Sequence, residues 1–534
     1  MCEVKGQLEV QPDGGQEEHQ DKPSVKTECN SYSRPELQGL VLRGQMSVDD
    51  VPSPAAESGL LSLPWEMIVL IASHLPAQCV ISVLPKVCRA LGNVAKDSTA
   101  WQLRARKLTG SQAGFPVGLS TDFDWIKACL EMEQLILCWG GQKHLSATRS
   151  QDDDREVERV IQQQRAGLER EPVAEGQEDD GDRRHDEERE DLAELKVPYA
   201  IEEEMEMALA EPRHLDNDND MELERHQLCS PAPSTSSALE CITIQSDHIA
   251  QVNSVLLVGD AGTVCATGSR DWNVKLWDLQ EGSGGSLLQT LGAQGNFSTH
   301  RGWVWCLASR GPLLASGGFD STVRLWDLDS GGAERGLIRT GAAVLCLSYQ
   351  TDVLLAGTFD RRVRIYDIRA AEPLVKTLHL HGNAVMCLAE DDKYIISGSK
   401  DCTVAMYDRR AGKSLKQLQL NSYLLSMSYS DSEFWAGDCK GMIHSFSMEA
   451  GMFKHVSQFD VGHTALITGI YKSPGSLYTC STDCTVKIHI PCAPPRTLCT
   501  LRHQSTVLRL NVQDGVLAVA SGDVGCVKVW RPAK

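Results

Sequence analysis

The stretch SGGFDSTVRLWD, from Ser316 to Asp327, decides the fold of this chain. It holds a strand end, a tight turn with Gly and Asp, and a second strand with alternating apolar and polar side chains. The residue that closes the second strand recurs at intervals of 49, 40, 41, 39, 43 and 41 residues, at Trp277, Trp326, Tyr366, Tyr407, Phe446, His489 and Trp530. A period of about 40 to 45 residues is typical of propellers with four-stranded blades. The repeat predicts an all-β, seven-bladed propeller over residues 238–534.

Ring closure can also be predicted. The seventh repeat supplies three strands of its own, and an open ring would leave unpaired sheet edges. The strand ALECITI, residues 238–244, lies before the first repeat and has no other partner. We therefore expect it to complete the seventh blade and to close the ring.

The net charge of −20 is concentrated in one segment. Residues 151–226 contain 28 Asp and Glu against 10 Lys and Arg, a balance of −18, which leaves −2 for the remainder. Such charge density predicts a disordered acidic linker over residues 149–237, and a polar composition predicts a disordered leader over residues 1–57. The net charge of −20 argues against a nucleic-acid-binding surface as a whole, which needs excess Lys and Arg.

Localisation and redox state follow from what the chain lacks. MCEVKGQLEV has no apolar core of a secretory signal, and no run reaches the ~18 apolar residues of a membrane span. We expect an intracellular, soluble protein in the cytoplasm, with the nucleus left open. The 19 Cys are then expected to be free thiols, with Cys306, Cys346 and Cys387 as small buried residues, and Cys480 with Cys484 lacks the spacing of a zinc site.

A small helical module lies between the leader and the linker. Met67, Ile68, Leu70, Ile71 and Leu75 recur at steps of three and four residues, which predicts one apolar helical face. Short helices follow up to residue 104, and a further amphipathic stretch predicts a helical extension over residues 105–148. A unit of about 45 residues has little core of its own, so its remaining apolar surface needs a partner.

The sequences LPWEMIVLIASHLP and VCRALGNVAKDSTAW resemble an F-box over residues 58–104. The match departs at Leu91, where that family often has Trp. The resemblance implies docking to the small adaptor subunit of an SCF-type cullin-RING ubiquitin ligase, and through it to the cullin and RING subunits. The residues that it assigns to adaptor binding are Leu63, Pro64, Glu66, Ile68, Ile71 and Leu75. An ordinary three-helix linker bundle is the alternative.

The repeats resemble the WD40 family. A His precedes the first strand of several repeats, as at His248, His300, His381, His463 and His503. The resemblance implies that this His, a strand Ser or Thr, the turn Asp and the closing aromatic form a hydrogen-bonded relay in each blade. It assigns a structural role to His300, Asp320, Trp326, His381 and Asp401. A hydrolase built on one His, Asp and Ser is an alternative, but the repetition of the set without a unique nucleophile favours a structural role.

In WD40 propellers the residue before the turn Asp faces the rim, and we expect loops there to bind a partner. The predicted substrate-binding residues are Arg270, Trp303, Phe319, Phe359, Lys400 and Tyr423. We expect Phe319 to turn outward. Aromatic residues with a few cations favour a protein ligand held by a mixed hydrophobic contact, and a phosphorylated or acidic degron stays open.

Together the two modules resemble the F-box/WD repeat family. This resemblance implies a non-catalytic substrate-recognition subunit of an SCF-type ligase, which raises the effective concentration of a substrate lysine near the ubiquitin-conjugating enzyme. We expect no catalytic residue, no metal and no cofactor. The alternative is a WD40 interaction scaffold without a ligase role.

Overall fold

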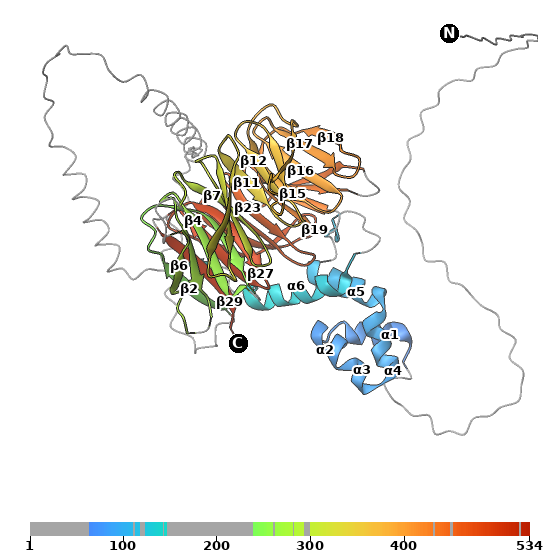
Figure 1. Cartoon of the computed structure of the whole chain (residues 1–534). Coiled ribbons are helices and arrows are strands. Elements are labelled where there is room, and N and C mark those ends of the chain that lie inside the picture. Colours follow the sequence, from blue (N-terminus) through green and yellow to red (C-terminus); the bar gives the residue numbers. More distant parts are fainter. Residues whose placement is uncertain are drawn as a thin grey trace, which may run out of the picture. The chain divides into compact units, whose positions relative to one another are not determined.

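The computed structural model describes residues 63–110, 113–117, 123–141, 144–146, 239–259, 262–280, 282–292, 299–430, 433–448, 452–522 and 525–533. The expected leader over residues 1–57 and the expected linker over residues 149–237 lie outside these described residues. Within them, a group of helices precedes seven β-sheets (Figure 1).

The helical part begins with short helices and ends with two longer ones. The helices are α1 (Trp65–Ala72), α2 (Ala77–Ser82), α3 (Leu84–Val87), α4 (Arg89–Gly92), α5 (Ser98–Thr109) and α6 (Trp125–Trp139), with the 3₁₀-helix η2 (Asn93–Lys96) before α5. Aspartates begin the longer two: Asp97 accepts from the backbone N–H of Thr99 at 2.9 Å and Asp124 from that of Lys127 at 3.0 Å. None of the described helices is long and apolar enough to span a membrane.

Each blade is an antiparallel sheet whose strands follow one another from the inside outward. Blade 1 comprises β3 (Val252–Val258), β4 (Val264–Ser269), β5 (Val274–Asp278) and β6 (Leu287–Thr290), and blade 2 comprises β7 (Val304–Arg310), β8 (Leu313–Gly318), β9 (Thr322–Asp327) and β10 (Ala333–Arg339). Blade 3 comprises β11 (Val344–Ser348), β12 (Leu354–Thr358), β13 (Val363–Tyr366) and β14 (Leu374–Leu378), and blade 4 comprises β15 (Val385–Glu390), β16 (Tyr394–Ser399), β17 (Thr403–Asp408) and β18 (Lys413–Gln419).

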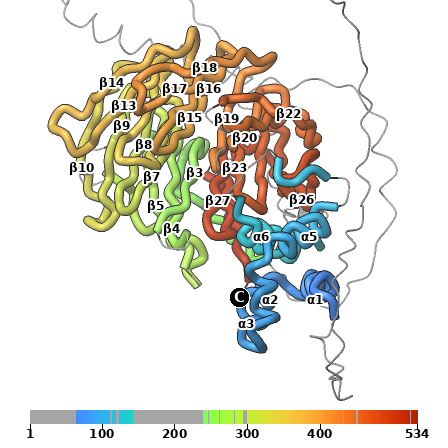
Figure 2. Tube along the Cα trace, turned by 90° about the vertical axis from the view of Figure 1, so that its right-hand side faces the viewer, coloured from blue at the N-terminus to red at the C-terminus, as the bar shows by residue number. Residues whose placement is uncertain are grey.

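Blades 5 to 7 follow the same plan. Blade 5 comprises β19 (Leu424–Ser430), β20 (Glu433–Asp438), β21 (Met442–Ser447) and β22 (Lys454–Asp460), and blade 6 comprises β23 (Ile467–Lys472), β24 (Leu477–Ser481), β25 (Thr485–Ile490) and β26 (Arg496–Arg502). Blade 7 comprises β27 (Val507–Gln513), β28 (Val516–Ser521), β29 (Cys526–Pro532) and β2 (Leu239–Gln245). The inner strands contact one another in order, and β27 returns to β3, so the ring is closed. Figure 2 shows inner strands such as β3, β15 and β23 gathered together and outer strands such as β10, β18 and β22 at the periphery.

Strand β2 closes the ring as the sequence predicts. It pairs antiparallel with β29 from Leu239 opposite Pro532 to Gln245 opposite Cys526, and it supplies the fourth strand of blade 7. Blade 6 has a fifth strand, β1 (His144–Ser146), which runs parallel to β26. The edges of both blades are therefore covered by chain that precedes the first blade.

The repeated Asp holds the turn between the second and third strands. Asp271 accepts the backbone N–H of Asn273 at 3.0 Å, and Asp320 accepts that of Thr322 at 3.1 Å. This is the Asx-turn geometry, in which a short carboxylate replaces a backbone acceptor. The Asp at this point of the repeat is explained by the turn as well as by the relay.

Helix α6 packs against blade 6. Glu131 accepts from the Ser473 hydroxyl at 2.6 Å and from the Gly475 backbone N–H at 2.8 Å. Gly475 lies so close to the helix that an added Cβ would collide with the carbonyl oxygen of Ala128. Buried residues of the helices and of blades 6 and 7 form one continuous hydrophobic cluster, which includes Trp139. The helical part and the propeller therefore share a core.

Candidate functional site

An exposed apolar surface lies on the first helix and its flanks. Its large side chains are each between 38% and 44% exposed: Leu63, Trp65, Met67, Leu70, Ile71 and Leu75. We call these six residues the helical apolar face. Exposure of this many large apolar side chains close together in sequence is typical of a surface that a partner covers.

The opposite side of α1 is buried. Ile68, Val69 and Ala72 lie in the same hydrophobic cluster as Trp101. Of the six residues predicted to bind an adaptor, Leu63, Pro64, Glu66, Ile71 and Leu75 are exposed, whereas Ile68 is 6% exposed. The expectation that Ile68 lies on the docking surface is wrong, because a helical repeat of three and four residues does not by itself say which side faces the core.

A buried ion pair joins α1 and α2 to the later helices. Arg104 of α5 is paired with Glu133 of α6, and its guanidinium also donates to the Ala72 carbonyl at 2.7 Å. Glu133 accepts from the backbone N–H of Ala77 at 2.6 Å. Each charge is satisfied by backbone groups as well as by its partner, so removal of either would leave the other uncompensated.

The relay of blade 2 has the geometry that the WD40 resemblance implies. In blade 2, Nδ1 of His300 lies 3.0 Å from a carboxylate oxygen of Asp320, and Nε2 lies 2.8 Å from the Ser316 hydroxyl. Nε1–H of Trp326 donates to the same hydroxyl at 2.9 Å. Thr267 in blade 1 and Thr479 in blade 6 take the place of Ser316.

Blades 3, 4 and 5 vary the relay. In blade 4, His381 contacts Ser397 and Thr403 at 2.7 Å each, and lies 3.8 Å from Asp401. Blade 3 lacks the His, and the guanidinium of Arg364 donates to Asp360 at 2.6 Å instead. In blade 5, Asp438 pairs with His444 at 3.0 Å, so the acid lies at the end of the second strand. In these three blades, different side chains thus pair with the Asp of the relay.

The relay resembles a Ser-His-Asp triad in connectivity but not in access. The Ser316 side chain is 0% exposed, and its oxygen already accepts a hydrogen bond from Trp326. A nucleophile must reach its substrate, so this hydroxyl is placed for packing. Among the described residues, no group of three or more His, Cys, Asp and Glu is arranged to hold a metal.

The relay in blade 6 keeps its acid ionised. Burial pushes the pKa of Asp483 upward, but hydrogen bonds and charge from His463, with the Thr485 hydroxyl, hold that pKa at about 2. Burial lowers the pKa of His463 itself, against the opposing effect of Asp483. A carboxylate with a neutral imidazole therefore describes this pair near neutral pH.

Blade 7 has an incomplete relay. The register places Val519 where the relays of blades 1, 2, 4 and 6 have Ser or Thr, because Leu517 lies opposite Trp530 just as Leu314 lies opposite Trp326. Val519 is fully buried and supplies no hydroxyl. His503 stacks edge-on against Trp530, but its buried Nε2 has no hydrogen-bond partner.

We call the side of the propeller that carries these turns the turn face. One backbone hydrogen bond per blade joins the residue at the start of the turn after the second strand to the loop that precedes the inner strand. Phe319 donates to Trp303 at 2.9 Å, Lys400 to Ala384 at 2.9 Å, and Cys439 to Tyr423 at 3.1 Å. In blade 2 this bond sets the two predicted residues Phe319 and Trp303 side by side.

Five of the six predicted rim residues are partly exposed: Arg270, Trp303, Phe359, Lys400 and Tyr423. Phe319 is 1% exposed, with its ring centroid 5.6 Å from that of Trp303 and 5.2 Å from that of Trp305. The expectation that Phe319 turns outward is wrong. It packs beneath Trp303, so its contribution to binding would be to support that indole.

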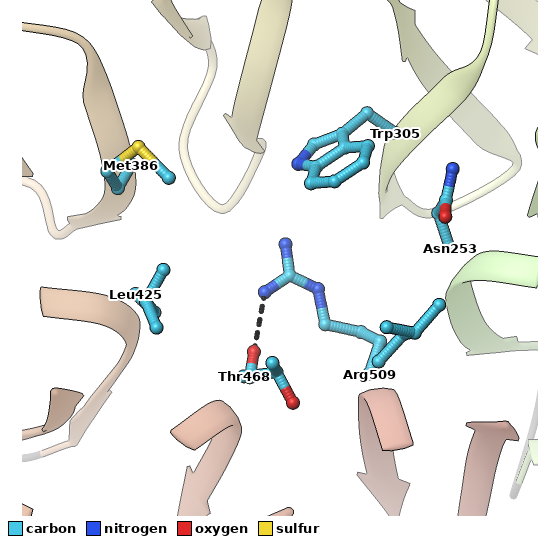
Figure 3. A pocket seen from close by; sticks show the side chains of 7 residues that line it. Asn253, Trp305, Met386, Leu425, Thr468 and Arg509 are labelled. Atoms are coloured by element: carbon cyan, nitrogen blue, oxygen red, sulfur yellow. Dashed lines mark hydrogen bonds between the residues drawn. The ribbon is translucent and has the colours of Figure 1, made fainter. Parts of the chain in front are cut away.

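Sequence analysis missed the residues that line the central channel. Near its start, each inner strand bulges and turns one residue towards the channel, and the lining includes Asn253, Trp305, Met386, Leu425, Thr468 and Leu508 together with Arg509 (Figure 3). In blade 2 the bulge lies between Val304 and Cys306, directly after the predicted rim residue Trp303. The lining side chains therefore sit immediately below the turn face. The sequence offered one signal for this lining, which was Trp305. It lies two residues after the predicted rim residue Trp303, and residues two apart point to the same side of a strand.

Sequence comparison with known proteins is consistent with this architecture. The family described as WD domain, G-beta repeat matches residues 239–278, 292–327 and 372–408. The chain is 38% identical over 479 residues to F-box/WD repeat-containing protein 9 of Bos taurus, covering 89% of this chain and 83% of the relative. It is 38% identical over 482 residues to the Homo sapiens protein of the same name, covering 90% and 84%. The crystal structure of the WD40 beta propeller domain of Doa1 aligns with a TM-score of 0.48 at 20% identity, over 56% of this chain and 98% of that one.

Proposed function

The chain belongs to the F-box/WD repeat protein family, and on this premise we propose that it is the substrate receptor of an SCF-type cullin-RING ubiquitin ligase. The helical apolar face would dock the small adaptor subunit, which brings the cullin and the RING subunit. The turn face would hold a protein substrate. No group of this chain would take part in the chemistry, which proceeds by proximity between a substrate lysine and the charged conjugating enzyme.

The observation that carries the proposal is the exposed helical apolar face on a helix whose opposite side, with Ile68, Val69 and Ala72, is buried. When a partner removes such apolar side chains from water, the complex gains a binding free energy of about 25 cal/mol for each Å² of apolar surface buried. Arg104 and Glu133 hold α1 and α2 to the later helices through bonds to the buried residues Ala72 and Ala77. The face is therefore available to a partner without rearrangement of the core.

The packing of α6 against blade 6 also supports a receptor role. A receptor gains from a fixed separation between its docking surface and its substrate surface, because a stiff connection keeps the effective concentration of the substrate lysine high. The bonds from Ser473 and Gly475 to Glu131 provide such a connection within the described residues.

Co-purification with the adaptor and the cullin tests the proposal. The variant Ile71→Glu places a charge on the helical apolar face and should reduce adaptor binding by at least about tenfold, as expected for a hot-spot residue. The variant Gln78→Glu adds the same charge at an exposed polar position of α2 and should bind normally. Circular dichroism would confirm that both remain folded. Normal adaptor binding by folded Ile71→Glu, or no binding by the unmodified chain, would overturn the ligase role and favour an interaction scaffold.

A further inference from the structure

One cation breaks the repeat at the centre of the propeller. The position that follows the bulge in each inner strand is occupied by small residues in the other six blades: Ser254, Cys306, Cys346, Cys387, Ser426 and Gly469. In blade 7 it is Arg509. A long charged side chain in a row of small ones is not required by the fold, since the other six blades do without it.

The guanidinium of Arg509 points into the channel. Figure 3 shows it extending into the space between Thr468 and the indole of Trp305, with Met386 and Leu425 on the far side. One nitrogen, Nη1, donates to the Thr468 carbonyl at 3.1 Å. A guanidinium has five N–H donors, so this single bond leaves most of its capacity unused.

The walls around this cation are apolar. Trp305, Met386, Leu425 and Leu508 line the same space as Arg509, and the partly exposed state of its side chain shows that the space opens to solvent. Among the described residues, no carboxylate lies within ion-pair distance of Arg509. Apolar walls lower the local dielectric and strengthen an ion pair that forms there.

The mouth of the channel adds an aromatic wall. Phe319, Trp303 and Trp305 pack together, and the Arg270 guanidinium lies 4.1 Å from the Trp303 ring centroid. Arg270 also donates from Nε to Asn253 at 3.2 Å, which fixes it against the wall. A ligand that entered from the turn face would therefore pass apolar side chains before it met Arg509.

From this arrangement we propose that the channel is a binding site for a peptide carboxylate, held by Arg509 and flanked by an apolar residue on the wall of Trp303 and Trp305. A single guanidinium matches one carboxylate in bidentate geometry, whereas a phosphate group, with more charge and three acceptor oxygens, is best held by a cluster of arginines. The carboxylate belongs either to an Asp or Glu side chain or to a C-terminus. The inference rests on the receptor function above and specifies the chemistry of the substrate.

Two synthetic arrays of 12-residue peptides test the site on the full chain. One array is tethered at the C-terminus and acetylated at the N-terminus, so that only side chains supply carboxylates. The other is tethered at the N-terminus and presents free C-termini. We expect the tightest peptides of at least one array to carry a carboxylate next to an apolar residue, and the array that responds identifies the source of the carboxylate.

The Arg509→Gln variant should lose at least about tenfold in affinity for those peptides, as should replacement of the peptide Glu by Gln, and the two losses should not add. Arg509→Lys keeps the charge and should retain part of the binding. Arg339→Gln, an equal charge change on the exposed outer strand β10, should have no effect. Thermal unfolding checks that each variant is folded.

The proposal is overturned if folded Arg509→Gln binds as the unmodified chain does, or if neither array yields a peptide whose binding depends on a carboxylate next to an apolar residue. Peptide binding is measured without the adaptor. A failure here therefore leaves adaptor docking untouched, and a failure of adaptor docking leaves this site untouched.

Discussion

The incomplete relay of blade 7 predicts a stabilising substitution. Val519→Thr keeps nearly the same shape and places a hydroxyl where Thr267 stands in blade 1 and Thr479 in blade 6. In blade 1, the Thr267 hydroxyl lies 2.8 Å from Nε2 of His248 and accepts from Nε1–H of Trp277 at 2.8 Å. The new hydroxyl should give Nε2 of His503 the partner that it lacks.

The magnitude follows from two opposing effects. A buried polar atom without a partner costs about 1–3 kcal/mol, and restoring its hydrogen bond recovers part of that. Burying the added hydroxyl costs about 1–2 kcal/mol before its bonds are counted. We expect a net gain of about 1 kcal/mol in the free energy of unfolding, which raises Tm by about 2 °C for a domain of this size.

Thermal unfolding of three variants gives the result and its controls. Thr267→Val is the reverse change in blade 1, and it should destabilise by about 1–3 kcal/mol because His248 and Trp277 lose their shared partner. Val519→Thr in a His503→Phe background should lose stability instead of gaining it, since the hydroxyl then lacks its imidazole. If Val519→Thr lowers Tm in the unmodified chain, or if its effect is the same with and without His503, the relay argument is refuted.

Two further predictions concern acid stability and helix docking. Burial lowers the pKa of His503 to about 4, so the folded state takes up this proton only at lower pH than the unfolded state, whose pKa is about 6.5. The free energy of unfolding should therefore fall by about 2 kcal/mol from this group as pH drops from 6.5 to 5. Urea unfolding across this pH range should show that His503→Phe removes this part of the pH dependence. Gly475→Ala should push α6 away from blade 6 and speed hydrogen exchange of the amides of Trp125–Trp139. Gly336→Ala, whose Cβ would lie 3.7 Å from Leu325, should leave that exchange unchanged.

The sequence predicts the fold well because the fold is repeated. Seven spaced aromatic positions and the recurring turn Asp indicate the blades, and the need to cover a sheet edge predicts the partner of β29. The rim was predicted less well. Phe319 occupies the same repeat position as Arg270 and Lys400, but its apolar ring is buried against Trp303 and Trp305 while their charged ends stay partly in water. A repeat position fixes where a Cα lies, whereas the chemistry of the side chain decides which way it turns.

The same reasoning says where function should be sought in a chain of this kind. A residue that recurs in most blades, such as the relay His, is explained by the blade itself, because each blade must satisfy the same buried groups. A residue that departs from the repeat and places a charge among apolar side chains is not explained in that way. Arg509 is such a departure, since six blades fill the position with Ser, Cys or Gly and no described carboxylate pairs with it. The departure was visible in the sequence as one Arg in VLRLNV, but its meaning required the register that aligns the seven inner strands and turns that side chain into the channel.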